Sequence, residues 1–525
     1  MTDTTNPDSA TPDSATPDSA TRGGGDAGPP PGSPRLTRRR ALQLSGLGLL
    51  GASLGGTAWA RPGTPGGPVP AGGGPLAEPP TLSSVAGVLR ARLEVAETTV
   101  TVAGRRARLL TYNGTVPGPT LRLRPGDRLQ VQLVNRLAVP TNLHTHGLHV
   151  SPSGNADNTL TVHLLPGESF DYDIAVPADH PPGSYWYHPH EHHLVTDQLW
   201  GGLFGAMVVE DPEEVPVTRD RVLVVSDTTL DGSGRPVAVS TAERFRGREG
   251  ELVLVNGQLQ PVLDAPPGAR ERWRVVNACA SRFLRLRLDG QQLALLAIDG
   301  GRLPQPRPVD QVDVLPGGRA DLLVTTTAGT SRLTGVALPR MRRGDGPSAA
   351  PGVLATLQVG GTPAPALPPV PAAAAPADLR TVEPVARRRL VLAMGPPGGR
   401  AGEHEGHDGS GTGGGHEIAS IDGRSFDPAR TDHVVRLGTV EEWTWVNRSG
   451  MDHPMHLHVW PVQVVAEDGR PVTAVERQDV VLVRAGSELT VRIHFTDFPG
   501  RTLAHCHISD HEDGGMMAVV EAVPG

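Results

Sequence analysis

Short stretches in which apolar and polar residues alternate, each bounded by a turn, constrain the fold of this chain more than any other feature. The runs LRLR at 121–124 and LQVQL at 129–133 are separated by the turn sequence PGD at 125–127. A period of two residues is typical of a β-strand with one buried face. Comparable runs return at 273–277, 284–288, 442–447 and 489–494. The chain is therefore predicted to be all-β, with many short strands.

Composition agrees with this prediction. The 525 residues include 65 glycines and 52 prolines, which are turn formers and weaken long regular elements. A helix bundle is therefore disfavoured. Hydrophobic residues make up 38% of the chain, so sizeable cores are still possible.

The strand-like runs fall into three groups, and each group contains a Pro-Gly turn that enters a strand, at 166–167, 316–317 and 499–500. Three consecutive β-sandwich domains are therefore expected. Their predicted ranges are 83–212, 213–360 and 386–525, with a Gly/Pro/Ala linker at 61–82 and a Pro/Ala linker at 361–385. The boundary between the first two is marked only weakly, near Asp211 and Pro212.

Residues 1–60 are interpreted as a processing segment. The pentapeptide PDSAT occurs three times within residues 7–21, and such low complexity predicts disorder. A run of arginines at 38–40, a weakly apolar stretch at 41–56 and the small-residue pattern AWA at 58–60 then resemble a twin-arginine export signal. The alternative is a membrane anchor, which the recurring glycines disfavour. We expect a protein exported by the twin-arginine machinery, periplasmic or secreted, and not integral to the membrane.

The net charge and the cysteine and histidine content limit the classes of function that this chain can have. The net charge is −8 and all 48 basic residues are arginine, whereas nucleic-acid binders normally carry a basic excess. Two cysteines, Cys279 and Cys506, exclude a disulfide-rich scaffold. Twenty histidines, many of them clustered, point to metal binding.

Four His-x-His pairs carry that signal. They are His144/His146, His188/His190, His456/His458 and His505/His507. In a strand, residues i and i+2 point to the same side, so each pair presents two imidazoles to one point. A single pair would be expected by chance or as an exposed polar face, but four pairs confined to the first and third predicted domains indicate a metal cluster.

The last pair encloses Cys506, which a strand would point away from His505 and His507. A thiolate with two histidines and a weak axial methionine is the ligand set of an electron-transfer blue copper site. His453, Cys506, His511 and Met516 supply such a set. Met517 competes with Met516 for the axial position, and a core methionine is the alternative role for Met516.

In this order, the segments HTHG, YHPH, HPMHLH and HCHISDHEDGGM resemble the four copper-binding motifs of the multicopper oxidases, specifically the three-domain laccase-like bacterial branch. The resemblance covers roughly residues 83–525. It implies three consecutive cupredoxin-like Greek-key β-sandwiches and four coppers per chain. The middle domain contains no histidine, which agrees with the copper-free second domain of the family.

The resemblance also implies which residues bind which copper. The type 1 set is His453, Cys506, His511 and Met516; the type 2 ligands are His144 and His456; the type 3 ligands are His146, His188, His190, His458, His505 and His507. By analogy, a reductant gives up single electrons near His511 or His453. Cys506 then passes them to the cluster that reduces O₂ to two waters.

Oxygen reduction at a buried site requires protons, so nearby carboxyl groups are expected. Asp157, in GNADN at 154–158, and Glu512, directly after His511, resemble the proton-donating acids of the family. The alternative for each is an ordinary loop acid.

Three further features leave alternatives open. His192 could replace a named ligand if its strand bulges. Cys279 is interpreted as a buried apolar residue. A Gly/His/acid insert at 398–415, with His416 just beyond it, holds His404 and His407 and is either a disordered loop or a copper-capture segment.

The reductant is not specified by these motifs. Phenols and aromatic amines, as for a laccase, are the first expectation. Oxidation of Cu(I), Fe(II) or Mn(II) in copper tolerance is the alternative, weakened by the scarcity of methionine, at eight residues. A non-enzymatic envelope scaffold of the same fold is disfavoured by the complete ligand set. A two-domain copper nitrite reductase is disfavoured by the four pairs and the third domain.

Overall fold

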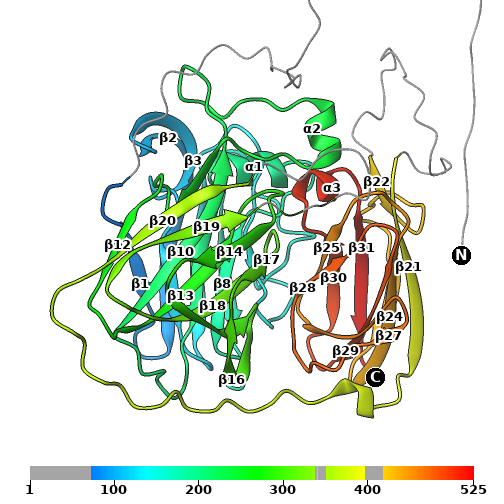
Figure 1. Ribbon diagram of the computed structural model, residues 1–525. Coiled ribbons are helices and arrows are strands. Elements are labelled where there is room, and N and C mark those ends of the chain that lie inside the picture. The colour runs from blue at the N-terminus through cyan, green and yellow to red at the C-terminus, as the bar shows by residue number, and fades with distance from the viewer. Residues whose placement is uncertain (1–72, 337, 339, 341–349, 396–417) are drawn as a thin grey trace, which may run out of the picture. The chain divides into compact units, whose positions relative to one another are not determined.

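The computed structural model describes residues 73–336, 338, 340, 350–395 and 418–525 (Figure 1). The expected signal segment at 1–60 and the insert with His404, His407 and His416 lie outside the described residues. No helix within the described ranges is both long and apolar enough to cross a bilayer.

The first stretch of the chain forms two facing sheets. Their strands are β1 (Thr81–Ser83), β2 (Val88–Val102), β3 (Arg105–Tyr112), β4 (Thr120–Leu123), β5 (Arg128–Asn135), β6 (His144–His146), β7 (Ser169–Ala175), β8 (Gly183–His188) and β9 (Gly205–Val209). Helix α1 (Val195–Gly201) lies between β8 and β9. The strand orders are β3-β2-β5-β7 and β1-β4-β9-β8-β6.

The middle stretch forms two more sheets, in the orders β11-β10-β13-β18-β15-β16 and β12-β20-β19-β14-β17. Its strands are β10 (Arg219–Thr228), β11 (Leu252–Val255), β12 (Val262–Ala265), β13 (Arg270–Asn277), β14 (Leu284–Leu288), β15 (Gln292–Ile298), β16 (Gly301–Val309), β17 (Val312–Val314), β18 (Arg319–Thr325), β19 (Gly329–Val336) and β20 (Gly352–Val359). Helix α2 (Thr241–Arg246) lies between β10 and β11.

The last stretch repeats the arrangement, with sheets β22-β21-β24-β29-β26-β27 and β23-β31-β30-β25-β28. Its strands are β21 (Ala386–Met394), β22 (Ala419–Ile421), β23 (His433–Arg436), β24 (Thr439–Asn447), β25 (His453–Leu457), β26 (Val462–Glu467), β27 (Arg470–Pro471), β28 (Val480–Val483), β29 (Glu488–Phe495), β30 (Gly500–Cys506) and β31 (Met517–Val523). Helix α3 (Ser509–Asp513) connects β30 to β31.

One topological feature recurs in all three stretches. An early strand pairs in parallel with the strand at the centre of its sheet, as β2 with β5, β10 with β13 and β21 with β24. The other pairs in these sheets are antiparallel. The prediction of an all-β chain of sandwiches is confirmed.

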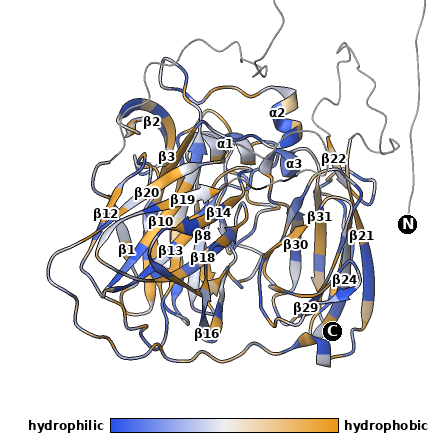
Figure 2. Ribbon diagram, in the orientation of Figure 1, coloured by the Kyte–Doolittle hydropathy of each residue, from blue (hydrophilic) through white to orange (hydrophobic). Residues whose placement is uncertain are grey.

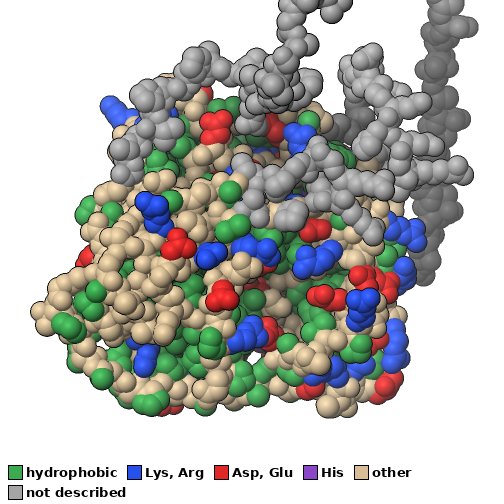
Figure 3. Space-filling model, viewed as in Figure 1, with side chains coloured by type: hydrophobic (Ala, Val, Ile, Leu, Met, Phe, Trp, Pro, Cys, Tyr) green, Lys and Arg blue, Asp and Glu red, His purple; other side chains and the backbone are tan. Residues whose placement is uncertain are grey.

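Each pair of sheets encloses an apolar cluster of its own, because inward-facing apolar residues alternate with polar ones along the strands. Figure 2 shows hydrophobic and hydrophilic stretches interspersed along the ribbon. In β5, for example, Leu129, Val131 and Leu133 are buried. Arginine and acidic side chains are interspersed over the face drawn in Figure 3.

The linker predicted at 61–82 is too long at its C-terminal end. Pro75 bridges to Val262, Leu76 donates its N–H to the Val262 carbonyl, and β1 begins at Thr81 and pairs in parallel with β4. Backbone pairing with strands distant in sequence therefore orders a Pro/Gly-rich segment that composition alone marks as flexible. The second predicted linker, 361–385, contains one short 3₁₀ turn, η1 (Leu379–Thr381).

Candidate metal centre

Two strand pairs carry five of the eight paired histidines, and His190, His458 and His507 lie one or two residues beyond the ends of these strands. In the first pair of sheets β6 lies antiparallel to β8, with His144 opposite His188. In the last, β25 lies antiparallel to β30, with His456 opposite His505. The corresponding strands of the middle stretch, β14 and β19, pair Leu286 with Gly335 and carry no histidine.

The eight histidines of the four pairs come together across the first and last stretches of the chain. All are at most 2% exposed. Two stacked ring pairs join the two stretches: His144 with His458 at a centroid distance of 4.0 Å, and His146 with His456 at 3.9 Å.

Candidate ligand atoms fall into overlapping groups of three, within 4.8 Å of one another in each group. The groups are His146, His188 and His507; His190, His458 and His505; and His144, His456 and His458. Each of the first two groups takes histidines from both stretches of the chain, so neither stretch holds a complete set alone.

The protonation state of these rings suits metal binding. Burial, reinforced by neighbouring imidazoles, holds the pKa of six of them well below the usual value: His146, His188, His190, His456, His458 and His507. Neutral imidazole is the form that binds a metal.

Hydrogen bonds outside the cluster select the nitrogen that faces it. His188 donates from Nδ1 to the Pro189 carbonyl (2.9 Å), and His456 donates from Nδ1 to the Asp479 carbonyl (2.7 Å). Nε2 of both rings is buried without a hydrogen-bond partner, as are Nε2 of His144, His146 and His507. Buried unpaired acceptors are costly unless something binds them. The donor set, neutral nitrogens aimed at common points, fits copper.

The two predicted acids lie at this cluster. An Asp157 oxygen is 2.9 Å from His144 Nδ1, and the carboxylate also accepts the Thr145 N–H at 2.9 Å. Glu512, on α3, is fully buried, with oxygens 3.2 Å from His190 Nε2 and 3.3 Å from His505 Nδ1. Asp157 therefore orients one histidine from outside, whereas Glu512 lies directly among the rings.

The second predicted centre is equally compact. Cys506 Sγ lies 3.6 Å from His453 Nδ1 and 3.8 Å from His511 Nδ1, and the two nitrogens are 3.3 Å apart. Because His505 and His507 point into the cluster, the predicted opposite orientation of Cys506 is observed. Burial raises the pKa of the Cys506 thiol, so a thiolate at neutral pH needs a bound cation.

The environments of the two neighbouring methionines differ. Met516 packs in the same apolar cluster as Cys506, and its backbone carbonyl accepts the Cys506 N–H at 3.0 Å. Met517 starts β31 and packs in a separate cluster with Leu503 and Val519. Met516 is the better placed of the two for an axial role.

The middle stretch of the chain covers the Cys506 centre. His511 donates from Nε2 to the Phe245 carbonyl of α2 at 3.0 Å, and α2 and α3 lie side by side (Figure 1). His453 and His511 are both fully buried. Neither ring edge is exposed to solvent in this conformation.

His192 and Cys279 lie outside both centres. The His192 ring lies against that of His193, with centroids 3.8 Å apart and the ring planes tilted by 33°. His192 belongs to none of the metal-capable groups among the described residues. Cys279 is a free thiol buried in the middle apolar cluster, as predicted.

Sequence reasoning missed three buried residues next to the cluster: Asp299, Arg319 and Asp479. Asp479 Oδ1 lies 3.6 Å from His456 Nδ1 and 3.7 Å from His146 Nδ1. These residues are not part of any sequence motif, and Asp299 and Arg319 belong to the middle stretch, which contains no histidine. No local pattern could therefore have identified them.

Comparison with known proteins agrees with this geometry. Models of the multicopper oxidase family match residues 94–214, 205–342 and 405–525. The chain is 28% identical to multicopper oxidase MmcO of Mycobacterium tuberculosis over 501 residues, covering 84% of this chain and 92% of that protein. It is 25% identical to a laccase of Bacillus subtilis over 487 residues, covering 78% and 89%.

Among solved structures, the chain resembles a multicopper oxidase from Campylobacter jejuni that is described as a metallo-oxidase. The TM-score is 0.76 at 28% identity, covering 87% of this chain and 96% of that one. The fold is thus that of the three-domain, cupredoxin-like multicopper oxidases.

Proposed function

This chain belongs to the multicopper oxidase family and is a copper-dependent oxidase, and from that premise we propose that it couples four one-electron oxidations of a reducing substrate to the reduction of O₂ to two waters. The observation that carries the proposal is the convergence of eight buried histidines in groups of three. A second buried group, His453, Cys506 and His511, adjoins this cluster, because Cys506 lies between His505 and His507 in the sequence.

We assign four coppers to these residues. His453, Cys506, His511 and Met516 would hold type 1 copper. His144 and His456 would hold type 2 copper, and the groups His146/His188/His507 and His190/His458/His505 would each hold one type 3 copper. Copper, when bound, supplies the one-electron redox chemistry and the affinity for oxygen.

The chain itself provides the connection between the centres. Cys506 is bonded to His505 and His507 through the backbone, so electrons have a short covalent path from one centre to the other. Glu512, buried between His190 and His505, is placed to hold a proton next to the reacting oxygen. Asp157 acts at His144, where its carboxylate accepts the Nδ1 proton.

For the reductant we propose phenols and aromatic amines, in keeping with the laccase among the relatives. A second candidate, a metal ion such as Cu(I), Fe(II) or Mn(II), is favoured by one observation. The outer edge of His511 is occupied by the Phe245 carbonyl, so a bulky aromatic ring cannot touch it without displacing α2.

Export through the twin-arginine machinery to a periplasmic or secreted location is likewise part of this proposal, on the arginines and small residues within 38–60.

Oxygen uptake by the copper-loaded protein tests the proposal. With a methoxyphenol as sole reductant, we expect copper-dependent uptake and no accumulation of peroxide. Uptake with Cu(I) or Fe(II) but not with the phenol would select the metal-ion candidate. Release of peroxide in proportion to the oxygen consumed, or uptake by copper-free protein, would refute four-electron reduction at these centres.

A further inference from the structure

The turn between β17 and β18, residues 315–318, lies against the histidine cluster although the middle stretch of the chain supplies no histidine. Gly317 has a φ of +77°, and a Cβ added there would lie 2.5 Å from the His507 ring. The Gly317 carbonyl accepts the indole N–H of Trp186 at 3.1 Å, and Trp186 stacks on His188. The middle stretch therefore contacts the cluster directly.

The residue after this turn, Arg319, makes the most specific of these contacts. Its guanidinium is fully buried and binds Asp479 through two parallel hydrogen bonds, both 2.6 Å. Its Nε donates to the Ser184 carbonyl at 3.0 Å, and Nη1 lies 3.5 Å from His146 Nδ1. Arg319 thus joins all three stretches of the chain at one point.

Asp479 is held from a second side. Asp299 Oδ2 accepts the backbone N–H of Asp479 at 3.0 Å and that of Val480 at 3.2 Å. The side chain and the backbone of Asp479 are therefore both restrained by the middle stretch. The carbonyl of this restrained residue accepts the Nδ1 proton of His456.

Gly147, the last residue of HTHG, has a structural role in the same arrangement. Its φ is +85°, and a Cβ added there would collide with Nη2 of Arg319 and lie 2.8 Å from Oδ2 of Asp479. The Arg319–Asp479 ion pair therefore packs directly against the end of β6, the strand that carries His144 and His146.

Not every buried ion pair of the middle stretch contacts the cluster. Arg221 and Glu271 are each 1% exposed and form a bidentate pair at 2.8 and 2.9 Å. Within the described part of the chain, Glu271 belongs to none of the groups that could hold a metal ion, and the hydrogen-bond partners of Arg221 include no histidine. This pair offers a matched comparison, because it has the same chemistry and burial without the imidazole neighbours.

We propose that Arg319 is a positioning residue for type 2 copper: with Asp299, it fixes Asp479 so that the Asp479 carbonyl holds His456 with Nε2 turned toward the cluster. This inference rests on the proposed function, which assigns type 2 copper to His144 and His456. Residues that orient a metal-binding histidine typically contribute 10-fold to 100-fold to metal affinity.

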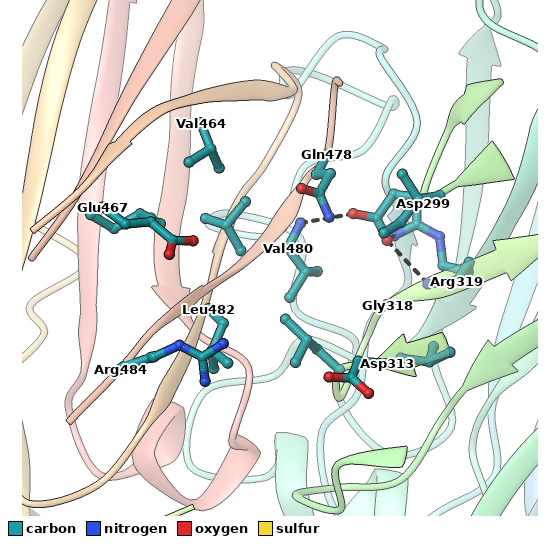
Figure 4. Close-up of a pocket in the computed structure, with 15 residues that line it drawn as sticks. Asp299, Asp313, Gly318, Arg319, Val464, Glu467, Gln478, Val480, Leu482 and Arg484 are labelled. Atoms are coloured by element: carbon teal, nitrogen blue, oxygen red, sulfur yellow. Dashed lines mark hydrogen bonds and ion pairs between the residues drawn. The ribbon is translucent and has the colours of Figure 1, made fainter. Parts of the chain in front are cut away.

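A cavity of about 230 Å³ is lined by Arg319 and Asp299. Figure 4 shows Asp299, Gly318 and Arg319 on one wall, with Val464, Glu467 and Leu482 on the other. A small cation such as guanidinium could enter it and take the place of a deleted arginine side chain.

The test compares wild type, Arg319→Lys and Arg221→Lys, each loaded with copper and then dialysed against a chelator. Type 1 and type 2 copper are quantified separately by electron paramagnetic resonance. For Arg319→Lys we expect type 2 copper to be retained about 10-fold less tightly, with altered hyperfine splitting and an unchanged type 1 signal. Arg221→Lys should match wild type in both signals. In Arg319→Ala, added guanidinium should restore type 2 copper, whereas sodium should not.

Unchanged type 2 retention and splitting in Arg319→Lys would overturn the inference. Parallel loss of both copper signals, or failure of both Arg319 variants to fold, would also overturn it, because Arg319 would then serve stability alone. Absence of a type 2 signal from the wild type would instead refute the proposed function, so the two failures are distinguishable.

Discussion

The carboxylate of Asp157 lies 2.9 Å from Nδ1 of His144, although the two residues are 13 positions apart and Asp157 is in a loop. The same carboxylate accepts the N–H of Thr145. This contact holds the ring with Nε2 toward the cluster, as second-sphere carboxylates do for metal-binding histidines.

Asp157→Asn should slow reoxidation of the fully reduced enzyme by O₂, by about 100-fold if the carboxylate also supplies a proton, and leave reduction of type 1 copper nearly unchanged. Stopped-flow absorbance measures the two half-reactions separately. Asp127→Asn is the control, because Asp127 is a buried acid of the same stretch that caps a turn at Arg124. An unchanged reoxidation rate would count against a proton role for Asp157.

Cys506→Ser should abolish the blue absorption and the oxidase activity while leaving the fold largely intact, because serine occupies almost the same volume but is a poor copper ligand. Circular dichroism and visible absorption check the two parts of this expectation. Cys279→Ser, at the other buried free thiol, should keep the blue colour. A blue, active Cys506→Ser protein would remove the type 1 assignment.

Replacement of α2 (Thr241–Arg246) by a short Gly-Ser linker should raise kcat/KM for bulky phenols several-fold, since the Phe245 carbonyl would no longer cover His511 Nε2. Rates with Fe(II) or Cu(I) should change less, because a small ion does not need direct contact with the imidazole. Ser240→Ala removes the capping box of α2 but keeps the helix sequence, so it should change the same rates in the same direction by a smaller factor. Equal changes for both kinds of reductant would show that α2 does not select between them.

His180 should make the copper-free protein less stable in acid. Burial lowers its pKa to about 4, and its Nε2 accepts the His149 N–H, a bond that protonation would break. The folded state therefore resists protonation while the unfolded state accepts it below about pH 6.5. Stability is fully present above that pH and declines toward pH 4, with a contribution of about 3 kcal/mol from this residue.

Urea unfolding of copper-free wild type and His180→Gln at pH 7 and pH 4.5 measures this contribution. Glutamine can still accept the His149 N–H but does not titrate, so the variant should lose less stability between the two pH values. The same loss in both proteins would mean that His180 does not cause the acid sensitivity.

The strands and the pairing of the candidate ligands are properties that the sequence determined by itself, because both depend on neighbours along the chain. A period of two residues sets which side chains share a face, so it predicted the alternating cores and also placed His505 and His507 opposite Cys506. The same locality explains the error at residues 73–82. Their glycines and prolines indicate flexibility, but strands far away in sequence order them.

The grouping of the histidines in threes, the cover over His511 and the Arg319–Asp479 contact were decided only by the tertiary structure. Each group of type 3 candidates takes rings from stretches of chain separated by more than 250 residues, and packing of the sandwiches determines which rings meet. Arg319 illustrates the limit most clearly. It is one of 48 arginines, and nothing in its local sequence distinguishes it. Its importance comes from its burial against the acidic partner Asp479 and the imidazole of His146. A buried charge needs a partner of opposite charge, and only the tertiary structure determines which residue supplies it.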